Sequence, residues 1–477
     1  MKYNSRIIKT HGKGFLEEKQ GIKVLHLKGA PYERGYQHGV LLKDEILEVL
    51  TSGLTGAAAV ITKATGNDFS LTIKKMMVGA KTMERYIPLE LKEEIRGIAD
   101  GIADAGISLT YDDVLLWNTM YDQWCFYAHP NYADPNNPPI RCSYPPGCSS
   151  FSAWGRATLD GKMIFGKNMD NLNLPGIIEN RILVIVDPEH GYGHAFITHP
   201  GMLAIDGGIN EDGIAMMTHY SASVNEGLQG CGIGVLTRLI LSKVHRIEDA
   251  IELLTVYPKC TGINYHVADS KVNRAVVIEV SATEVEARYP EQDKDILWTT
   301  NHFNCYPEWK GYTGYNMVLG QAPVYGLADV TTIERWQNSL IDRKNNIIPA
   351  AGRFKRYEQL LKENYGKITI ENGIKMLSDR YDPYTGEERS WTEPSPGHND
   401  IPTISMLYHP FPNDKIIEGV NYYKTNKTGS VNAYESNLWS LISVLRDGDI
   451  WLAIKDFPAQ RGPYEFFNLI DELNNNI

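Results

Sequence analysis

A cysteine at position 148 stands where cleavage of the chain could expose a nucleophile. Cys148 directly follows Gly147 and a proline-rich stretch, and it opens the run CSSFSAW. A thiol can attack the carbonyl of the peptide bond before it, and a preceding glycine freely adopts the unusual backbone conformation that this attack needs. Hydrolysis of the resulting thioester would leave Cys148 as a new N-terminus. The sequence therefore predicts self-cleavage between Gly147 and Cys148.

The α-amino group released by this cleavage would serve as the general base. A chain α-amino group has a reference pKa of roughly 7.7–8.0, close to neutral. It can take the proton from the thiol of its own residue, so that one residue supplies both the nucleophile and the base. His219, His302 and His398 are alternative bases, and we interpret each of them as a structural histidine or as part of the pocket lining.

Composition and motifs argue against several other classes of protein. The 477 residues include 47 Lys+Arg and 58 Asp+Glu, and the net charge of −11 gives no electrostatic basis for non-specific nucleic-acid binding. No charge-free apolar stretch approaches the ~18 residues of a spanning helix, so we do not expect an integral membrane protein. The sequence has no HExxH, P-loop, GxSxG or CxxC motif, and neither a metal nor an organic cofactor is predicted for the reaction.

The N-terminal residues and the cysteines bear on the compartment. Residues 1–15 have no apolar core and do not form a signal peptide. Six cysteines in 477 residues are too few for a disulfide scaffold, and apart from Cys148 we interpret them as packing or, for Cys142, as part of the linker. We expect a cytoplasmic protein, or a secreted one if a signal peptide has been removed.

A proline-rich linker divides the elements that must position the nucleophile. Six of the nineteen residues in 129–147 are proline. Before the linker, apolar spacing predicts one strand and then mainly helices. After it, Asp160-Gly161 between two apolar runs predicts a β-hairpin that begins at Cys148. We predict further strands at 181–186, 194–198, 214–219, 265–268, 275–280 and 296–300, and helices at 234–244, 247–254, 354–363 and 368–378. Such a block of strands flanked by helices indicates an α+β fold.

These segments resemble the acyl-CoA:6-aminopenicillanic acid acyltransferase family (isopenicillin N acyltransferase type) of N-terminal nucleophile hydrolases. The resemblance runs over most of the chain and is most specific in GCSSFSAWGRATLDGKMIFGKNMD; it recurs in LKGAPYERGYQHGVLL, GINEDGIAM, TTNHF, AGRFKRYEQLL and TISMLYHP. It implies a four-layer αββα sandwich. It also implies a helical segment 1–147 released by self-cleavage and a catalytic segment 148–477, which stay associated because the helices have apolar faces to bury.

The resemblance also implies roles for individual residues. Cys148 is then the nucleophile, Asp170 holds its amino group, and the Asn301 amide helps form the oxyanion hole. A later arginine of the family matches Arg353, in preference to Arg356. Lys167 and Asn168 occupy positions where relatives carry Arg and Asn, and Lys is not equivalent to Arg. Tyr220 stands where choloylglycine hydrolases carry a further Asn.

The implied enzyme is a thiol amidohydrolase or acyltransferase that cleaves a linear N-acyl amide through a Cys148 thioester. Water or an amine would take the acyl group, with an acceptor amine or acyl-CoA as the candidate second partner. Two alternatives stay open. One is an unprocessed cysteine-dependent esterase of the phospholipase-B-like kind, and the other is a non-catalytic binding relative, which the departures at Lys167 and Tyr220 favour.

Overall fold

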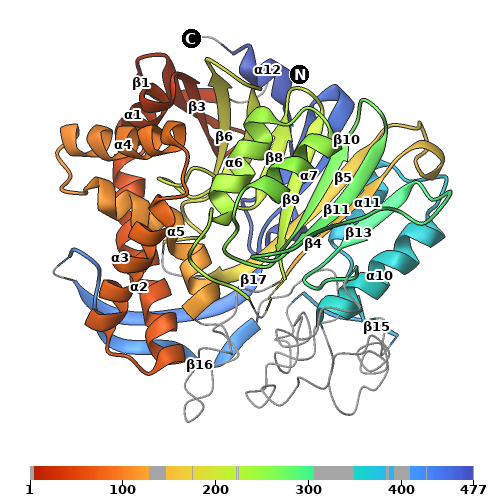
Figure 1. The fold of residues 1–477 in the computed structure, drawn as a ribbon. Helices are drawn as coiled ribbons and strands as arrows, with labels where there is room; N and C mark the ends of the chain where they lie inside the picture. Colours follow the sequence, from red (N-terminus) through yellow and green to blue (C-terminus); the bar gives the residue numbers. More distant parts are fainter. Residues whose placement is uncertain are drawn as a thin grey trace.

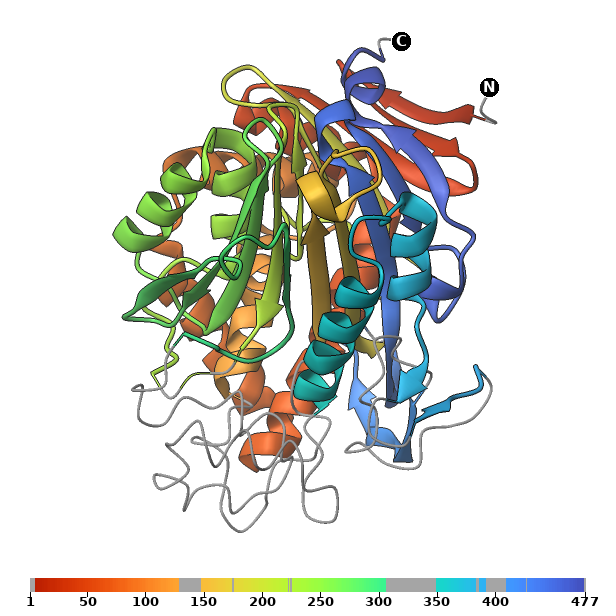
Figure 2. The same cartoon turned by 90° about the vertical axis from the view of Figure 1, so that its right-hand side faces the viewer.

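Two large β-sheets lie face to face between layers of helices in the computed structural model of the protein (Figures 1 and 2). The structure describes residues 5–127, 147–173, 176–221, 223, 225–305, 349–382, 386–391, 409–425 and 427–475. Most of the linker 129–147 and His398 lie outside these ranges. Contacts between β4 and β9 and between β11 and β13 join the inner faces of the two sheets.

The larger sheet has ten strands, and the first three come from the start of the chain. Strand β3 pairs with β6 in parallel, and every other neighbouring pair in this sheet is antiparallel. The strands in spatial order are β1 (Ser5–His11), β2 (Gly14–Lys19), β3 (Ile22–Gly29), β6 (Ile182–Pro188), β7 (His194–Thr198), β8 (Gly207–Asn210), β9 (Ile214–Tyr220), β10 (Ile263–Asp269), β11 (Arg274–Val280) and β12 (Val285–Arg288).

The smaller sheet has seven strands and contains the hairpin that begins at Cys148. Its order is β13 (Ile296–Thr299), β4 (Cys148–Ala153), β5 (Ile164–Asn173), β17 (Thr428–Val444), β18 (Asp449–Ala453) and β19 (Glu465–Asn468), with β16 (His409–Asn421) paired to β17. A separate two-stranded sheet joins β14 (Tyr381–Asp382) and β15 (Glu387–Glu388).

Helices cover the outer face of each sheet. Helices α6 (Ile233–Lys243) and α7 (Ile247–Val256) pack on the larger sheet, and α10 (Pro349–Glu363) and α11 (Ile370–Leu377) pack on the smaller one. The predicted αββα sandwich is therefore confirmed. The remaining helices are α1 (Pro31–Leu41), α2 (Lys43–Thr65), α3 (Phe69–Glu84), α4 (Leu89–Asp104), α5 (Tyr111–Tyr127) and α12 (Leu469–Leu473), and α1 to α5 form a group at one side of the sandwich (Figure 1).

The structure confirms the predicted hairpin and corrects the description of the N-terminal segment. Strands β4 and β5 pair antiparallel with Cys148 opposite Met169, and their connection includes a turn in which Asp160 Oδ1 accepts from the Lys162 amide. The segment before the linker contains the one predicted strand, β3, and two more, β1 and β2, that the sequence analysis missed. Charged residues such as Arg6, Glu17 and Glu18 hide the alternation of β1 and β2 from pattern analysis.

Helix α2 contains a longer apolar stretch than the sequence analysis found when it counted only charge-free residues. Among the described residues, Lys43–Lys63 is long and apolar enough to cross a membrane by length and composition. The charge of Glu48 interrupts this stretch, so the charge-free part was too short to be considered a membrane span. In the fold, 72% of the most apolar part of this stretch is buried, and the helix packs on α3 and α5, as is typical of a core helix.

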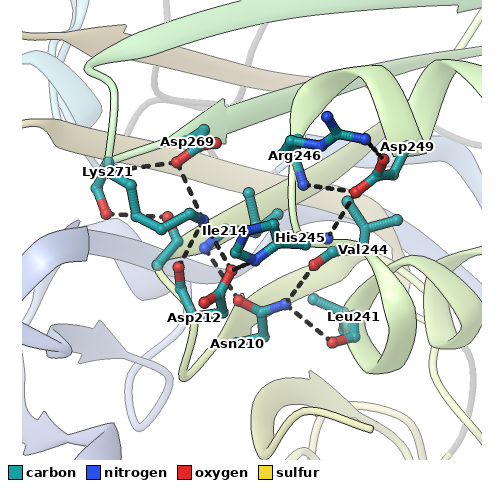
Figure 3. A network of polar contacts seen from close by, with 12 residues as sticks. Asn210, Asp212, Ile214, Leu241, Val244, His245, Arg246, Asp249, Asp269 and Lys271 are labelled. Atoms are coloured by element: carbon teal, nitrogen blue, oxygen red, sulfur yellow. Dashed lines mark hydrogen bonds and ion pairs between the residues drawn. The ribbon is translucent and has the colours of Figure 1, made fainter.

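A polar network ties the loop after α6 to the turns at one end of the larger sheet (Figure 3). Asn210 Nδ2 donates to the carbonyls of Leu241 and Val244 at 3.2 and 3.1 Å. Beside it, His245 Nδ1 lies 2.6 Å from a carboxylate oxygen of Asp212, which also accepts from Lys271 at 2.8 Å. The helical layer is thus attached to the sheet through side chains of the β8–β9 and β10–β11 turns.

Glycines and a buried charge cluster bring α1, α4 and α6 together. A Cβ at Gly35 or at Gly97 would overlap backbone of the facing helix, so only glycine permits this approach of α1 to α4. Glu94, fully buried in the contact, accepts from Arg34 at 2.9 Å and from Arg238 at 3.0 Å. Burial alone would raise the pKa of the Glu94 carboxyl, but the two guanidinium groups hold it below its usual value.

We expect Glu94→Gln to destabilise the fold strongly. The neutral amide leaves two arginines buried without a counter-charge, and breaking a buried ion pair in this way costs on the order of 3–5 kcal/mol. The change in the free energy of unfolding can be measured by chemical denaturation. Glu358→Gln, which removes an exposed pair with Lys362, is the control and should cost less than ~1 kcal/mol. Equal effects of the two substitutions would contradict this account.

Candidate active site

The two faces of the β4–β5 hairpin separate the thiol from its supporting residues. Side chains alternate along a strand, so Cys148, Ser150 and Ser152 share one face of β4. Ser150 and Ser152 contact the two ring nitrogens of His266, on β10 of the facing sheet, at 2.8 and 2.9 Å. Ser149, on the opposite face, contacts the Tyr357 hydroxyl on α10 at 3.1 Å. The thiol therefore lies between the two sheets.

The Cys148 thiol is buried among groups that pull its pKa in opposite directions. Its sulfur lies 3.3 Å from the Met169 sulfur on the paired strand. Burial raises the pKa of the Cys148 thiol, the nearby charge of Lys167 lowers it, and the carboxyl groups of Asp206 and Asp170 raise it. Burial prevails, so the thiol of the intact chain is held in its protonated form at neutral pH.

Lys167 and Asp206 place a buried pair of ionisable groups beside the thiol. Lys167 is on β5, on the thiol's face of the hairpin, and its ammonium donates to the Thr218 carbonyl on β9. Burial raises the pKa of Asp206 to about 7, although the charge of Lys167 and a hydrogen bond from Trp439 oppose this rise. Sequence analysis did not single out Asp206; the available signal was one carboxylate directly after the apolar run MLAI.

Asn301 connects the Cys148 backbone to Arg353. Its Oδ1 accepts from the Cys148 amide at 2.7 Å and from Arg353 Nη2 at 2.7 Å, and its Nδ2 donates to the Tyr220 carbonyl at 2.8 Å. Because two donors meet at one atom, that atom must be the carboxamide oxygen, which settles the orientation of the amide. Arg356 instead pairs with Asp379 at 2.8 Å, away from Asn301.

Gly147 lies directly against the guanidinium of Arg353. A Cβ at position 147 would overlap this guanidinium, so a larger residue would displace Arg353 from its contact with Asn301. The Gly147 carbonyl accepts a hydrogen bond from the Asp170 backbone amide at 3.1 Å. Both sides of the Gly147–Cys148 peptide bond are therefore held, the carbonyl by Asp170 and the nitrogen by Asn301.

Three other predicted residues support the site from different directions. Asp170 Oδ1 accepts from Asn437 Nδ2 at 2.9 Å on β17, a partner that sequence analysis did not find. Asn168 anchors α11 to the sheet, since its Nδ2 donates to the Leu377 carbonyl at 2.8 Å. Tyr220 reaches Asn301 through its carbonyl, while its hydroxyl donates to Glu226 at 3.1 Å.

The described histidines make no contact with the Cys148 sulfur. Within the described ranges, no histidine lies within hydrogen-bonding distance of the Cys148 sulfur. Burial lowers the pKa of His219 well below its usual value, and burial lowers that of His302 to about 3. Their ring nitrogens contact the Asn264 carbonyl and the Thr300 hydroxyl, as is typical of structural histidines.

An αββα sandwich whose central hairpin opens with a cysteine has the arrangement expected of the N-terminal nucleophile hydrolase class. Residues 157–395, just over half of the chain, match the family model "Acyl-coenzyme A:6-aminopenicillanic acid acyl-transferase". The chain belongs to this family. The matched region includes Lys167, Asp170, Asn301 and Arg353, and it begins after Cys148.

The relatives and the solved structures that resemble this chain share little sequence identity with it. An uncharacterized protein of Archaeoglobus fulgidus is 26% identical over 404 residues, which cover 81% of this chain and 63% of that protein. Protein dcd1B of Dictyostelium discoideum is 21% identical over 296 residues, covering 58% of this chain and 53% of that protein. The alignments thus span less than two thirds of either relative.

Two solved structures are similar at low identity. A mutant of conjugated bile acid hydrolase from Clostridium perfringens is 13% identical, with a TM-score of 0.38 over 69% of this chain and 95% of its own. Penicillin V acylase from Agrobacterium tumefaciens is 12% identical, with a TM-score of 0.36 over 68% and 88%. The family assignment rests on the family model.

We expect Lys167→Met to slow alkylation of Cys148 and to shift its pH profile upward. The Lys167 charge lowers the pKa of the thiol, so its removal leaves less thiolate at a given pH. The rate of Cys148 modification by iodoacetamide can be followed against pH by peptide mass spectrometry. Lys167→Arg keeps the charge and is the matched control. Superimposable profiles for Lys167→Met and the wild type would contradict an electrostatic role of Lys167.

Proposed function

We propose that the protein is a self-processing thiol amidohydrolase or acyltransferase that cleaves its own chain between Gly147 and Cys148. The observation that carries this proposal is the way this one peptide bond is held. Its carbonyl accepts from the Asp170 amide, its nitrogen donates to Asn301, and Arg353 packs against Gly147. A hydrogen bond at the carbonyl oxygen stabilises the negative charge that develops there during nucleophilic attack.

Self-cleavage would begin with an acyl shift from nitrogen to sulfur. The Cys148 sulfur bonds to the Gly147 carbonyl carbon, the carbon–nitrogen bond breaks, and the thiol proton passes to the departing nitrogen. Water then hydrolyses the thioester, which leaves a carboxylate at Gly147 and returns the thiol of Cys148, whose α-amino group was released in the acyl shift. The Asn301 oxygen that accepts from the peptide nitrogen is already in position for this amino group.

The processed enzyme would use the same thiol on a linear N-acyl amide. The α-amino group takes the thiol proton, the sulfur attacks the substrate carbonyl, and the proton passes to the leaving amine. The acyl group is then transferred from the thioester to water, or to an acceptor amine in the transferase reaction, with acyl-CoA as the alternative acyl donor. Membership of a family described by acyl transfer to 6-aminopenicillanic acid supports this substrate class.

The two products of cleavage would stay together. Strand β3, before the cleavage point, forms a parallel ladder with β6, after it. The Trp117 side chain of α5 is buried and donates to the Pro200 carbonyl at 2.9 Å, and Glu94 pairs with Arg238 across the same boundary. Separation of the chains would expose a continuous hydrophobic core, which opposes dissociation.

Intact-mass spectrometry of the wild type and of Cys148→Ala tests self-processing. We expect two fragments that meet at Gly147/Cys148 in the wild type and one full-length chain in Cys148→Ala. An unbroken wild-type chain would overturn self-cleavage. If that chain were alkylated at Cys148 and hydrolysed esters, the unprocessed esterase would be the better description, and an inert thiol would favour the binding relative.

We expect Asn301→Ala to slow processing, because the Cys148 nitrogen loses its acceptor, and to lower kcat, because loss of an oxyanion donor typically costs about 10²–10³-fold. Asn301→Asp separates two roles of this residue. The aspartate keeps an acceptor for the Cys148 nitrogen and Arg353, but it lacks the Nδ2 donor. In the wild type this donor binds the Tyr220 carbonyl and must leave it to stabilise an oxyanion. Both variants should therefore lose turnover of an N-acyl amide.

The matched control is Asn304→Ala, which removes a nearby side chain whose Nδ2 makes a long contact of 3.4 Å with the His302 carbonyl. This variant should process and turn over at close to the wild-type rate. A wild-type kcat in Asn301→Asp would contradict the oxyanion role. Asn301 would then only position the Gly147–Cys148 peptide bond.

A further inference from the structure

Three buried side chains converge between the N-terminal strands and the C-terminal helix. Glu17 on β2, His26 on β3 and Glu472 on α12 each offer one donor atom, and these three atoms lie within 4.8 Å of one another. His26 Nε2 is 2.9 Å from Glu17 Oε1 and 3.7 Å from Glu472 Oε2. Figures 1 and 2 show α12 beside this edge of the larger sheet, where β1 to β3 lie.

The outer oxygens of both carboxylates are held by other groups. The Ser5 hydroxyl donates to Glu17 Oε2, and the Lys19 ammonium donates to Glu472 Oε1. Each carboxylate therefore turns its other oxygen inward, toward His26. Such supporting contacts orient the ligands in metal sites of proteins. The His26 ring is further fixed by stacking on Phe15, with the ring centroids 4.0 Å apart.

Glu472 Oε2 is the inward-facing oxygen of the cluster that lacks a hydrogen-bond donor. The Glu472 side chain is 1% exposed, and no donor forms a hydrogen bond with this oxygen in the structure. His26 Nε2, at 3.7 Å, is too far away for a hydrogen bond to this oxygen, and a buried carboxylate oxygen without a donor is costly.

We propose that Glu17, His26 and Glu472 bind a divalent first-row transition-metal ion, with Zn²⁺ as the best match. Zinc takes imidazole nitrogen and carboxylate oxygen at roughly 2.0–2.2 Å, which places neighbouring ligand atoms about 3.3 Å apart in a tetrahedral site. The separations of 2.9 and 3.7 Å bracket that value. Calcium and magnesium prefer sites made entirely of oxygen, so the imidazole disfavours them.

This metal would join the two ends of the chain. Glu17 and His26 precede the Gly147–Cys148 bond, and Glu472 lies near the C-terminus. The ion would stabilise the fold by its binding free energy, because its ligands come together only in the folded state. The site lies apart from Cys148 and does not depend on the proposed function. If the chain is cleaved, the same ion links the two products.

Metal analysis of the purified full-length protein tests the site directly. After exposure to equimolar Zn²⁺ and removal of unbound ion, we expect about one zinc per chain by elemental analysis. His26→Gln and Glu472→Gln should each bind Zn²⁺ more than ~10-fold more weakly, since even second-shell partners of a metal are worth about that much. His245→Gln is the matched control, because His245 belongs to an exposed histidine–aspartate pair and should not alter zinc retention.

A second readout keeps the test decisive if the variants fold poorly. Chelator-treated wild type, titrated with Co²⁺, should develop the visible absorption of a low-symmetry cobalt site, and Zn²⁺ should abolish it and raise Tm. Absence of both the absorption and the Tm shift in the wild type would overturn the proposal. Zinc retention equal to the wild type in His26→Gln and Glu472→Gln would also overturn it.

Discussion

The hydrogen bond from the Cys148 amide to Asn301 is the contact on which the candidate site depends. It joins the first residue of β4 to the loop after β13, and Arg353 on α10 binds the same Asn301 oxygen. A single carboxamide thus gathers three distant parts of the chain around one peptide bond. Because that oxygen accepts from two donors, a shift of either donor changes the hydrogen bond to the other. The absence of a side chain at Gly147 lets the guanidinium approach closely enough to take part.

The β4–β5 ladder distributes the remaining roles by strand alternation. Residues on one face, Cys148 and Lys167, meet the larger sheet, where burial and opposing charges set the pKa of the thiol. Asn168 on the other face binds α11 and fixes the hairpin from behind. The Asp170 backbone amide extends the ladder to the Gly147 carbonyl. The hydrogen bond that continues the sheet is therefore the same one that would polarise the bond to be cleaved.

The N-terminal segment is part of the sandwich and does not form a separate domain. Its strands extend the larger sheet, and its helices bury Glu94 against Arg238 of α6. A cut at Gly147 would thus divide the chain without dividing the core. The cluster of Glu17, His26 and Glu472 lies at the far edge of the same sheet, where the first strands meet the last helix. Both ends of the chain are consequently held by buried charged groups.

The sequence by itself determined those features of the fold that depend on residues close together along the chain. The hairpin from Cys148, the αββα class and most central strands follow from alternation, turn residues and family motifs, and these also led to Asn301 and Arg353. Only the tertiary structure decided the partners that come from remote segments. Asp206 beside the thiol, Asn437 on Asp170 and the strands β1 and β2 in the larger sheet carry no local signal that is specific enough to assign them these places. Their roles come from burial and from pairing across the fold, which a linear pattern does not encode.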